Sequence, residues 1–166
     1  MRLVDLRIAR AQPELAEAVG NIGFDAWQNS PFGHDDAGRT DRQKLLAEFV
    51  TFCRDKPQTI LVASGHGTIL GWGAREDMDH VISDLWVAPV AQRQGVGVAL
   101  LEALEEAIAK QGFAFAELET YAGHAGAVRF YLRQGYEPVW RGMKFSASLN
   151  YELDKIRFRK PLREAA

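Results

Sequence analysis

The chain has 166 residues, 47% of them hydrophobic and 25% charged, with a formal net charge of -2. This length is typical of one domain, and the charge excludes the strongly basic surface that nonspecific nucleic-acid binding requires. No apolar run approaches the ~20 residues that cross a bilayer. We therefore expect a single cytoplasmic domain over residues 1–166, with no nucleic-acid or membrane partner.

The sequence offers no pattern of metal ligands. Its four histidines form neither a helical i, i+4 pair nor an HExxH motif. The single cysteine, Cys53, excludes an internal disulfide and a thiolate cluster, and we expect it to be buried as a small apolar residue. No metal site is predicted.

The N-terminal third predicts one strand followed by two helices. Residues 3–9 alternate apolar and polar side chains, as a strand does, and helical spacing of apolar residues follows Pro13. Residues 29–40 are rich in Ser, Pro, Gly and Asp and predict a loop, which is a candidate substrate segment. Asp41 is the candidate N-cap of a second helix that continues to about Cys53.

Three consecutive strands are predicted next, over residues 59–64, 68–76 and 80–87. The sequence GHG separates the first two and is a hairpin signal, and an acidic turn precedes the third. Short turns between consecutive strands predict an antiparallel meander.

An amphipathic helix is predicted after Gly97, ending near Gly112. One face carries Val96, Leu100, Leu104, Ala107 and Ile108, and the other carries Glu102, Glu105, Glu106 and Lys110. We expect the first face to be buried and the second to be exposed.

The remaining elements complete an α/β fold. A strand over residues 113–121 is expected to pair in parallel with residues 80–87 through a right-handed crossover. A helix over residues 124–134 and two strands, roughly 136–145 and 151–159, follow. The prediction is a mixed central sheet of about seven strands with helices on both faces.

Two closely spaced glycines, Gly95 and Gly97, open the amphipathic helix directly after a strand and Pro89. The first amides of a helix have no intrahelical acceptor and carry partial positive charge, so the amides of residues 94–98 are suited to a pyrophosphate, with Arg93 adding a charged contact. The P-loop lysine and the third glycine of the dinucleotide fingerprint are both missing, which argues against an NTPase and a Rossmann dehydrogenase.

The strand before this turn supplies a second binding element. Pro89 removes a ladder donor, so the strand is expected to diverge from its parallel neighbour near Val87. Unpaired backbone groups of Leu85, Trp86 and Val87 would then bind an extended, amide-bearing arm as a sheet edge binds a peptide. A ligand with a pyrophosphate at one end and amides along a thin arm is coenzyme A.

At this point the sequence resembles the GNAT superfamily of acetyl-CoA-dependent N-acetyltransferases. Its glycine motif matches residues 92–97, QRQGVG, and its second pattern is met by Ala127, the pair Phe130-Tyr131, and Gly135 with an aromatic residue after it. His124 stands where the family usually has Asn. The resemblance is strong over about residues 81–141 and weaker before them.

The resemblance implies roles for individual residues. The CoA pyrophosphate would be held by the backbone amides of Gln92, Arg93, Gln94, Gly95, Val96, Gly97 and Val98. The pantetheine arm and the acetyl carbonyl would be bound by Leu85, Trp86 and Val87. The cofactor site would also include His124 and Ala127. Tyr131 would be the general acid that protonates the departing thiolate after direct attack by an amine, since a phenol remains protonated at neutral pH.

The general base is not fixed by the resemblance. Many family members place a Glu six residues before Val87, but this chain has Val81 there. Asp84, His80 and Glu119 are the nearby alternatives, and Asp84 is slightly preferred because it shares a strand face with Trp86, which directs it toward the acceptor side. Proton removal through ordered water and attack by an amine that is already neutral stay open as alternatives to a side-chain base.

The acceptor is expected to be an amine, either a small molecule or a peptide. Acidic residues in the loop and at the meander turn, Asp35, Asp36, Glu76, Asp77 and Asp79, favour a cationic amine. The aromatics Trp27, Phe32, Trp72 and Trp86 are candidate pocket residues, and the basic run KIRFRK is interpreted as a charged strand with one exposed face.

A different class of function stays open. A CoA-binding or acyl-CoA-sensing module that keeps the glycine turn without turnover is favoured by Val81 and His124, which both depart from the family pattern. The family also makes a homodimer possible.

Overall fold

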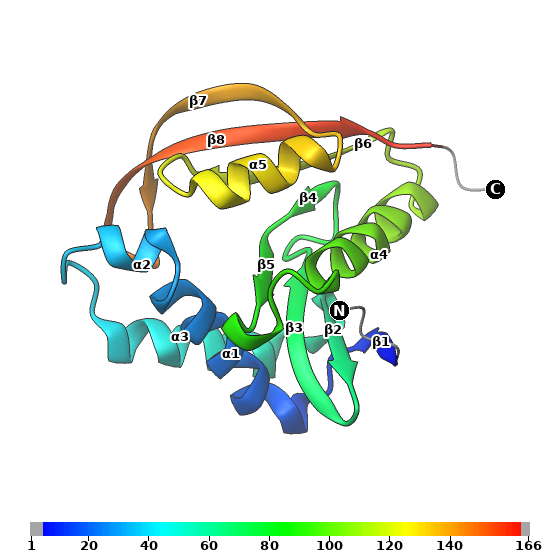
Figure 1. Ribbon diagram of the computed structural model, residues 1–166, viewed down its shortest axis with the longest axis horizontal. Coiled ribbons are helices and arrows are strands. Elements are labelled where there is room, and N and C mark those ends of the chain that lie inside the picture. Colours follow the sequence, from blue (N-terminus) through cyan, green and yellow to red (C-terminus); the bar gives the residue numbers. More distant parts are fainter. Residues whose placement is uncertain (1–4, 164–166) are drawn as a thin grey trace.

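The computed structural model describes residues 5–163, which form two four-stranded sheets with helices packed against them (Figure 1). The strands are β1 (Leu6–Arg10), β2 (Ile60–Gly65), β3 (Thr68–Ala74), β4 (Val81–Ile82), β5 (Asp84–Val87), β6 (Phe115–Tyr121), β7 (Glu137–Ser146) and β8 (Tyr151–Pro161). The helices are α1 (Ala16–Gln28), α2 (Pro31–Asp35), α3 (Arg42–Asp55), α4 (Val96–Lys110) and α5 (Ala125–Arg133). The predicted α/β class is confirmed.

The first sheet has the strand order β1-β2-β3-β5, and every neighbouring pair is antiparallel. A two-residue turn at His66 and Gly67 joins β2 to β3, where Gly65 pairs with Thr68, so the predicted hairpin is confirmed. The predicted meander is confirmed as well, because β2, β3 and β5 follow one another in the sheet.

The second sheet has the strand order β4-β6-β8-β7. β4 and β6 are parallel, while β6 and β8, and β8 and β7, are antiparallel. The long β7 and β8 ribbons arch over α5 (Figure 1).

The predicted strand over residues 80–87 is divided at Ser83. Its first part, β4, pairs with β6 through Val81–Glu117 and Ile82–Leu118, and its second part, β5, pairs with β3 in the other sheet. The expected single sheet therefore opens into two at this point. The divergence from β6 begins at Ser83, four residues earlier than the predicted break near Val87, which is a correction to the sequence analysis.

Helices cover both faces of the first sheet. α1 and α3 pack on the face that carries Ile60 and Trp72, and Cys53 is buried there as expected, with burial raising the pKa of its thiol to about 12. α4 packs on the other face, where Leu100 meets Ala63. Successive side chains of β2 point to opposite faces of the sheet, so Ile60 packs against α1 and α3 while Ala63 packs against α4.

The helix α4 starts and ends where the sequence indicates. Val96, Leu100, Leu104 and Ile108 are all buried, and Gly112 follows its last turn with a φ of 97°. Two expectations are not met. Ala107 is only part-buried, and Glu105 is buried, because its carboxylate accepts hydrogen bonds from the Tyr136 hydroxyl at 2.8 Å and the Lys160 ammonium at 3.0 Å. Both partners come from later parts of the chain.

The segment predicted as a loop over residues 29–40 contains the short helix α2. Ser30 caps it by accepting from the Gly33 amide at 3.4 Å, and Asp41 caps α3 by accepting from the Lys44 amide at 3.1 Å, as predicted. α3 continues to Asp55. Among residues 5–163, no helix combines the length and apolarity that a membrane span needs.

Candidate active site

The glycine turn presents free helix amides. A 3-10 turn (Pro89–Ala91) leads into the N-cap Gly95, and the first α4 hydrogen bond is donated by the Ala99 amide to the Gly95 carbonyl at 3.0 Å. The amides of residues 96–98 therefore have no intrahelical acceptor, and no side chain caps them. Together with the helix dipole, they form an anion-binding end.

Gly95 is required by backbone conformation and leaves room for a ligand. Its φ is 87°, a left-handed conformation that other residues adopt only at a cost, and a Cβ placed there meets nothing within 4 Å. A Cβ on Gly97 makes only ordinary contact, 3.5 Å from the Phe130 ring. These two glycines therefore expose the turn instead of filling a tight packing position.

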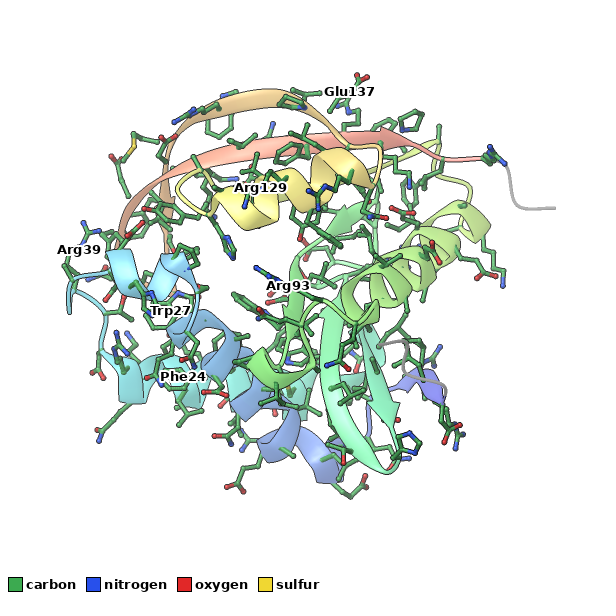
Figure 2. All side chains as sticks on the ribbon, viewed as in Figure 1. Phe24, Trp27, Arg39, Arg93, Arg129 and Glu137 are labelled. Carbon is green, nitrogen blue, oxygen red and sulfur yellow. The ribbon has the colours of Figure 1, made fainter. Side chains whose placement is uncertain are left out.

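Arg93 belongs to the same turn and also has a positive φ, of 63°. Its side chain extends from the turn toward the side on which α5 lies (Figure 2). The contact of Arg93 with a pyrophosphate stays a prediction.

The outer edge of β5 lies next to this turn. The Ala88 amide donates to the Leu70 carbonyl at 2.8 Å, and antiparallel alternation then directs the backbone groups of Trp86 toward β3 and those of Leu85 and Val87 away from it. No strand of the described chain pairs with this outer edge, because the partners of β6 are β4 and β8. The Val87 carbonyl accepts from the Gln92 side chain at 3.2 Å, so the groups left for a ligand arm are mainly those of Leu85 and the Val87 amide.

Tyr131 is 8% exposed, and its ring centroid lies 5.8 Å from that of Tyr136 and 5.9 Å from that of Phe158. The Tyr131 hydroxyl makes no hydrogen bond to a described residue. Among the described side chains, the fully enclosed polar atoms without a partner are the indole nitrogens of Trp27 and Trp72, so the Tyr131 hydroxyl is not fully enclosed. The accessible part of Tyr131 therefore includes its hydroxyl. Burial raises the pKa of this phenol, which keeps it protonated at neutral pH.

Asp84 lies at the start of β5, where the sheets separate. Its carboxylate accepts hydrogen bonds from the Trp86 indole at 3.1 Å and from the Ser83 hydroxyl at 2.9 Å. Burial raises its pKa and outweighs these hydrogen bonds, which act in the opposite direction. A carboxylate with a raised pKa is a stronger base than an ordinary aspartate.

The other two candidate bases are already paired. The His80 imidazole lies 2.7 Å from the Glu117 carboxylate. Glu119 accepts from Lys144 at 2.9 Å and from Arg157 at 3.0 Å. Burial of Glu119 acts to raise its pKa, but these cations outweigh burial and lower it. Asp84 therefore has the environment that best suits a base.

A cavity of about 330 Å³ lies beside β4, on the side where the sheets separate, and its lining includes Val81, Ser83, Glu119, Lys144, Lys155 and Arg157. Val81 thus faces this cavity from the position where the family usually has its base. Asp84 does not line the cavity itself but is joined to it by the Ser83 hydroxyl. Residue types alone gave no reason to select Ser83, Lys144, Lys155 or Arg157.

Three of the five acidic residues expected around the acceptor have partners elsewhere. Asp36 is buried and accepts from Thr40 and Tyr151, and Asp35 accepts from the Tyr121 hydroxyl at 2.7 Å. These contacts tie the α2 segment to the ends of β6 and β8. Glu76 lies 3.5 Å from Lys56 in an exposed ion pair. None of these acids lines the cavity.

Of the aromatics proposed for the acceptor pocket, Trp72 is fully enclosed in the core between the first sheet and α3. Trp27 is 2% exposed and packs with Phe32 in a separate cluster that also contacts Trp86. Trp86 is half-buried and is the one of the four that contacts Asp84 directly.

His124 begins α5. Its Nδ1 accepts the Ala127 amide at 3.2 Å, so it fills the N-cap position with the geometry that Asn usually supplies. Burial lowers the pKa of the imidazole, which favours the neutral form that this acceptor role requires. The departure from the family pattern at His124 therefore preserves the local structure.

Within residues 5–163, no three His, Cys, Asp or Glu side chains are grouped in a way that could hold a metal ion.

Comparisons with known proteins identify the fold of the chain. The whole chain resembles a GCN5-related N-acetyltransferase from Rhodopseudomonas palustris at a TM-score of 0.79 and 20% identity, with 98% of this chain and 99% of that chain covered. The ribosomal-protein-S18-alanine N-acetyltransferase from Escherichia coli gives 0.70 and 20%, covering 97% and 96%. The PaiA N-acetyltransferase from Thermoplasma acidophilum, in complex with coenzyme A, gives 0.64 and 17%, covering 95% and 99%.

At sequence identities this low, the TM-scores show a shared fold. A comparison with curated protein sequences finds no match. The sequence model of the Acetyltransferase (GNAT) family matches residues 22–136, which is more than half of the chain and includes the glycine turn and α5. The chain therefore belongs to the GNAT acetyltransferase family.

Proposed function

We propose that this protein transfers an acetyl group from acetyl-CoA to a primary amine by direct attack, and that residues 1–166 act as one catalytic domain. The observation that supports this most strongly is the free amide end of α4 beside the unpaired edge of β5. The amide end suits a diphosphate, and the strand edge suits the amides of a pantetheine arm.

The residues of the chain divide the proton transfers between them. Asp84, directly or through the Ser83 hydroxyl, accepts a proton from the ammonium form of the acceptor, so that the nitrogen can attack the thioester carbon. As the carbon–sulfur bond breaks, the Tyr131 hydroxyl donates its proton to the leaving thiolate, the second proton lost by the attacking nitrogen restores the phenol, and Asp84 releases its proton to solvent. The outward amides of β5 are placed to bind the carbonyl oxygen on which negative charge develops.

The acid limb of the pH profile tests Asp84. Because burial raises its pKa, we expect kcat/KM to fall as the pH drops through a value above that of an ordinary aspartate. Asp84→Asn should lower kcat/KM by about 10²-fold and remove this limb. Asp154→Asn changes an exposed aspartate paired with Arg141 and should alter neither. A wild-type pH profile in Asp84→Asn would remove Asp84 from the mechanism.

Turnover itself separates this proposal from a CoA-binding or acyl-CoA-sensing module. Wild-type protein should release thiol from acetyl-CoA in steady state when amines are added, and mass spectrometry should detect the acetylated amine. A module that only binds would take up CoA in calorimetry and show no amine-dependent thiol. That outcome would replace the proposed function with the alternative.

A further inference from the structure

Three cations converge on one carboxylate at the cavity beside β4. Lys144 from β7 lies 2.9 Å from Glu119, Arg157 from β8 lies 3.0 Å from it, and Lys155 from β8 lies 4.0 Å from it. The remaining acidic group of the cavity, Glu117, is already paired with His80 and Arg159. The cavity therefore has more positive than negative charge.

Lys155 is the cation with the weakest partner. Its nitrogen is too far from Glu119 for a hydrogen bond, while Lys144 and Arg157 both donate to that carboxylate. The Lys155 side chain is only 23% exposed, and burial, together with the charge of Lys144, lowers its pKa. An anion in the cavity would compensate this charge. Since the whole chain has a net charge of -2, the cluster is not part of a generally basic surface.

This cluster lies level with the proposed reaction centre. The last parallel pair is Ile82–Leu118, so the next residues, Ser83 and Glu119, face each other across the opening between the sheets. Val81, at the family's usual position for a base, lines the same cavity. The cations are therefore placed beside the site where the amine would lose its proton.

We infer that the acceptor is a small amine that also carries an anionic group, held by Lys155 with Lys144 and Arg157. This inference rests on the proposed acetyl transfer. Ser83, which donates a hydrogen bond to Asp84, lines the same cavity as the three cations, so one small molecule in that cavity can present its amine near Ser83 and its anionic group to the cations. The cavity volume of about 330 Å³ suits a molecule of amino-acid size.

This conclusion reverses the earlier expectation of a cationic acceptor. The acids that suggested it, Asp35 and Asp36 above all, are used to anchor the α2 segment. The basic run KIRFRK, interpreted from sequence as a charged strand with one exposed face, lies in β8 and supplies Lys155 and Arg157 to the cavity.

The test is a panel of matched amines with acetyl-CoA. Amino acids and aminoalkylphosphonates are compared with the corresponding carboxamides and with spermidine, and thiol release is followed. We expect kcat/KM to be at least ten-fold higher for the anionic members, in the range of one charge-assisted hydrogen bond. A preference between carboxylate and phosphonate would identify the anion. Equal or better use of carboxamides or spermidine would overturn the inference while leaving acetyl transfer intact.

A pair of variants connects the preference to the cluster. Lys155→Met should raise the KM for the best anionic amine about ten-fold, with little change for its carboxamide and an unchanged Kd for CoA. Lys110→Met removes an exposed lysine of α4 and serves as the control. An unchanged preference in folded Lys155→Met would contradict the assignment. If the wild-type protein releases no thiol with any small amine, the inference is overturned. If it also releases none with peptides that carry a free N-terminus or a lysine, the proposed function is overturned as well.

Discussion

Gly95→Leu is expected to lower the affinity for CoA by at least 100-fold. The new side chain would occupy the open space next to the free amides of α4, where a Cβ now meets nothing within 4 Å. Charge-assisted hydrogen bonds are each worth about 1.5–3 kcal/mol, and loss of two of them accounts for this factor. Isothermal titration calorimetry with CoA measures the change directly.

Gly112 provides a matched control at the other end of the same helix. Its φ of 97° is close to the 87° of Gly95, and its added Cβ also meets nothing within 4 Å. Gly112→Leu and Gly95→Leu should therefore each lose about 1–2 kcal/mol of stability, the cost of a left-handed conformation. Only Gly95→Leu should lose CoA binding. Equal affinity in both variants would refute the proposed phosphate site.

Tyr131→Phe is expected to lower kcat by about 10²-fold while leaving stability and CoA affinity nearly unchanged. The hydroxyl bonds to no described residue, so its removal takes away no hydrogen bond of the fold, and the ring stays packed against Phe158. Steady-state kinetics with the best amine gives kcat, and thermal unfolding gives stability.

Tyr136→Phe is the matched control for this prediction. It removes the hydroxyl of the neighbouring buried tyrosine, which donates to Glu105 at 2.8 Å. We expect Tyr136→Phe to lose about 1–3 kcal/mol of stability and to keep kcat, the reverse of the Tyr131→Phe pattern.

Because burial raises the pKa of Tyr131, wild-type kcat should show no alkaline loss at pH values below 10. Full turnover in Tyr131→Phe would end its role as the acid.

Local patterns predicted most of the helices and strands. The strand-like runs of β2 and β3, the turn between them and the helical spacing in α4 each depend on residues close in sequence, and all three elements were confirmed. Features fixed by distant partners were missed. Glu105 is buried because Tyr136 and Lys160 reach it, and the break at Ser83 follows from competition between β3 and β6 for one strand.

In the candidate site as well, the residues on short sequence motifs were predicted and those brought together by distant strands were not. The glycine turn and the helix with Tyr131 lie on short motifs, so residue spacing was sufficient to find them. Lys144, Lys155 and Arg157 meet Glu119 only because β6, β8 and β7 lie side by side. Their basic character is visible in the sequence, but the cavity they share depends on the strand register.

The most direct test of the account is where CoA contacts the chain. In an NMR titration of ¹⁵N-labelled protein with CoA, we predict the largest amide shift changes at Gln94, Gly95, Val96, Gly97 and Val98, with a second group at Leu85 and Val87. Shift changes that gather on other elements, or an unaltered spectrum at millimolar CoA, would contradict the assignment of this helix end as the phosphate site.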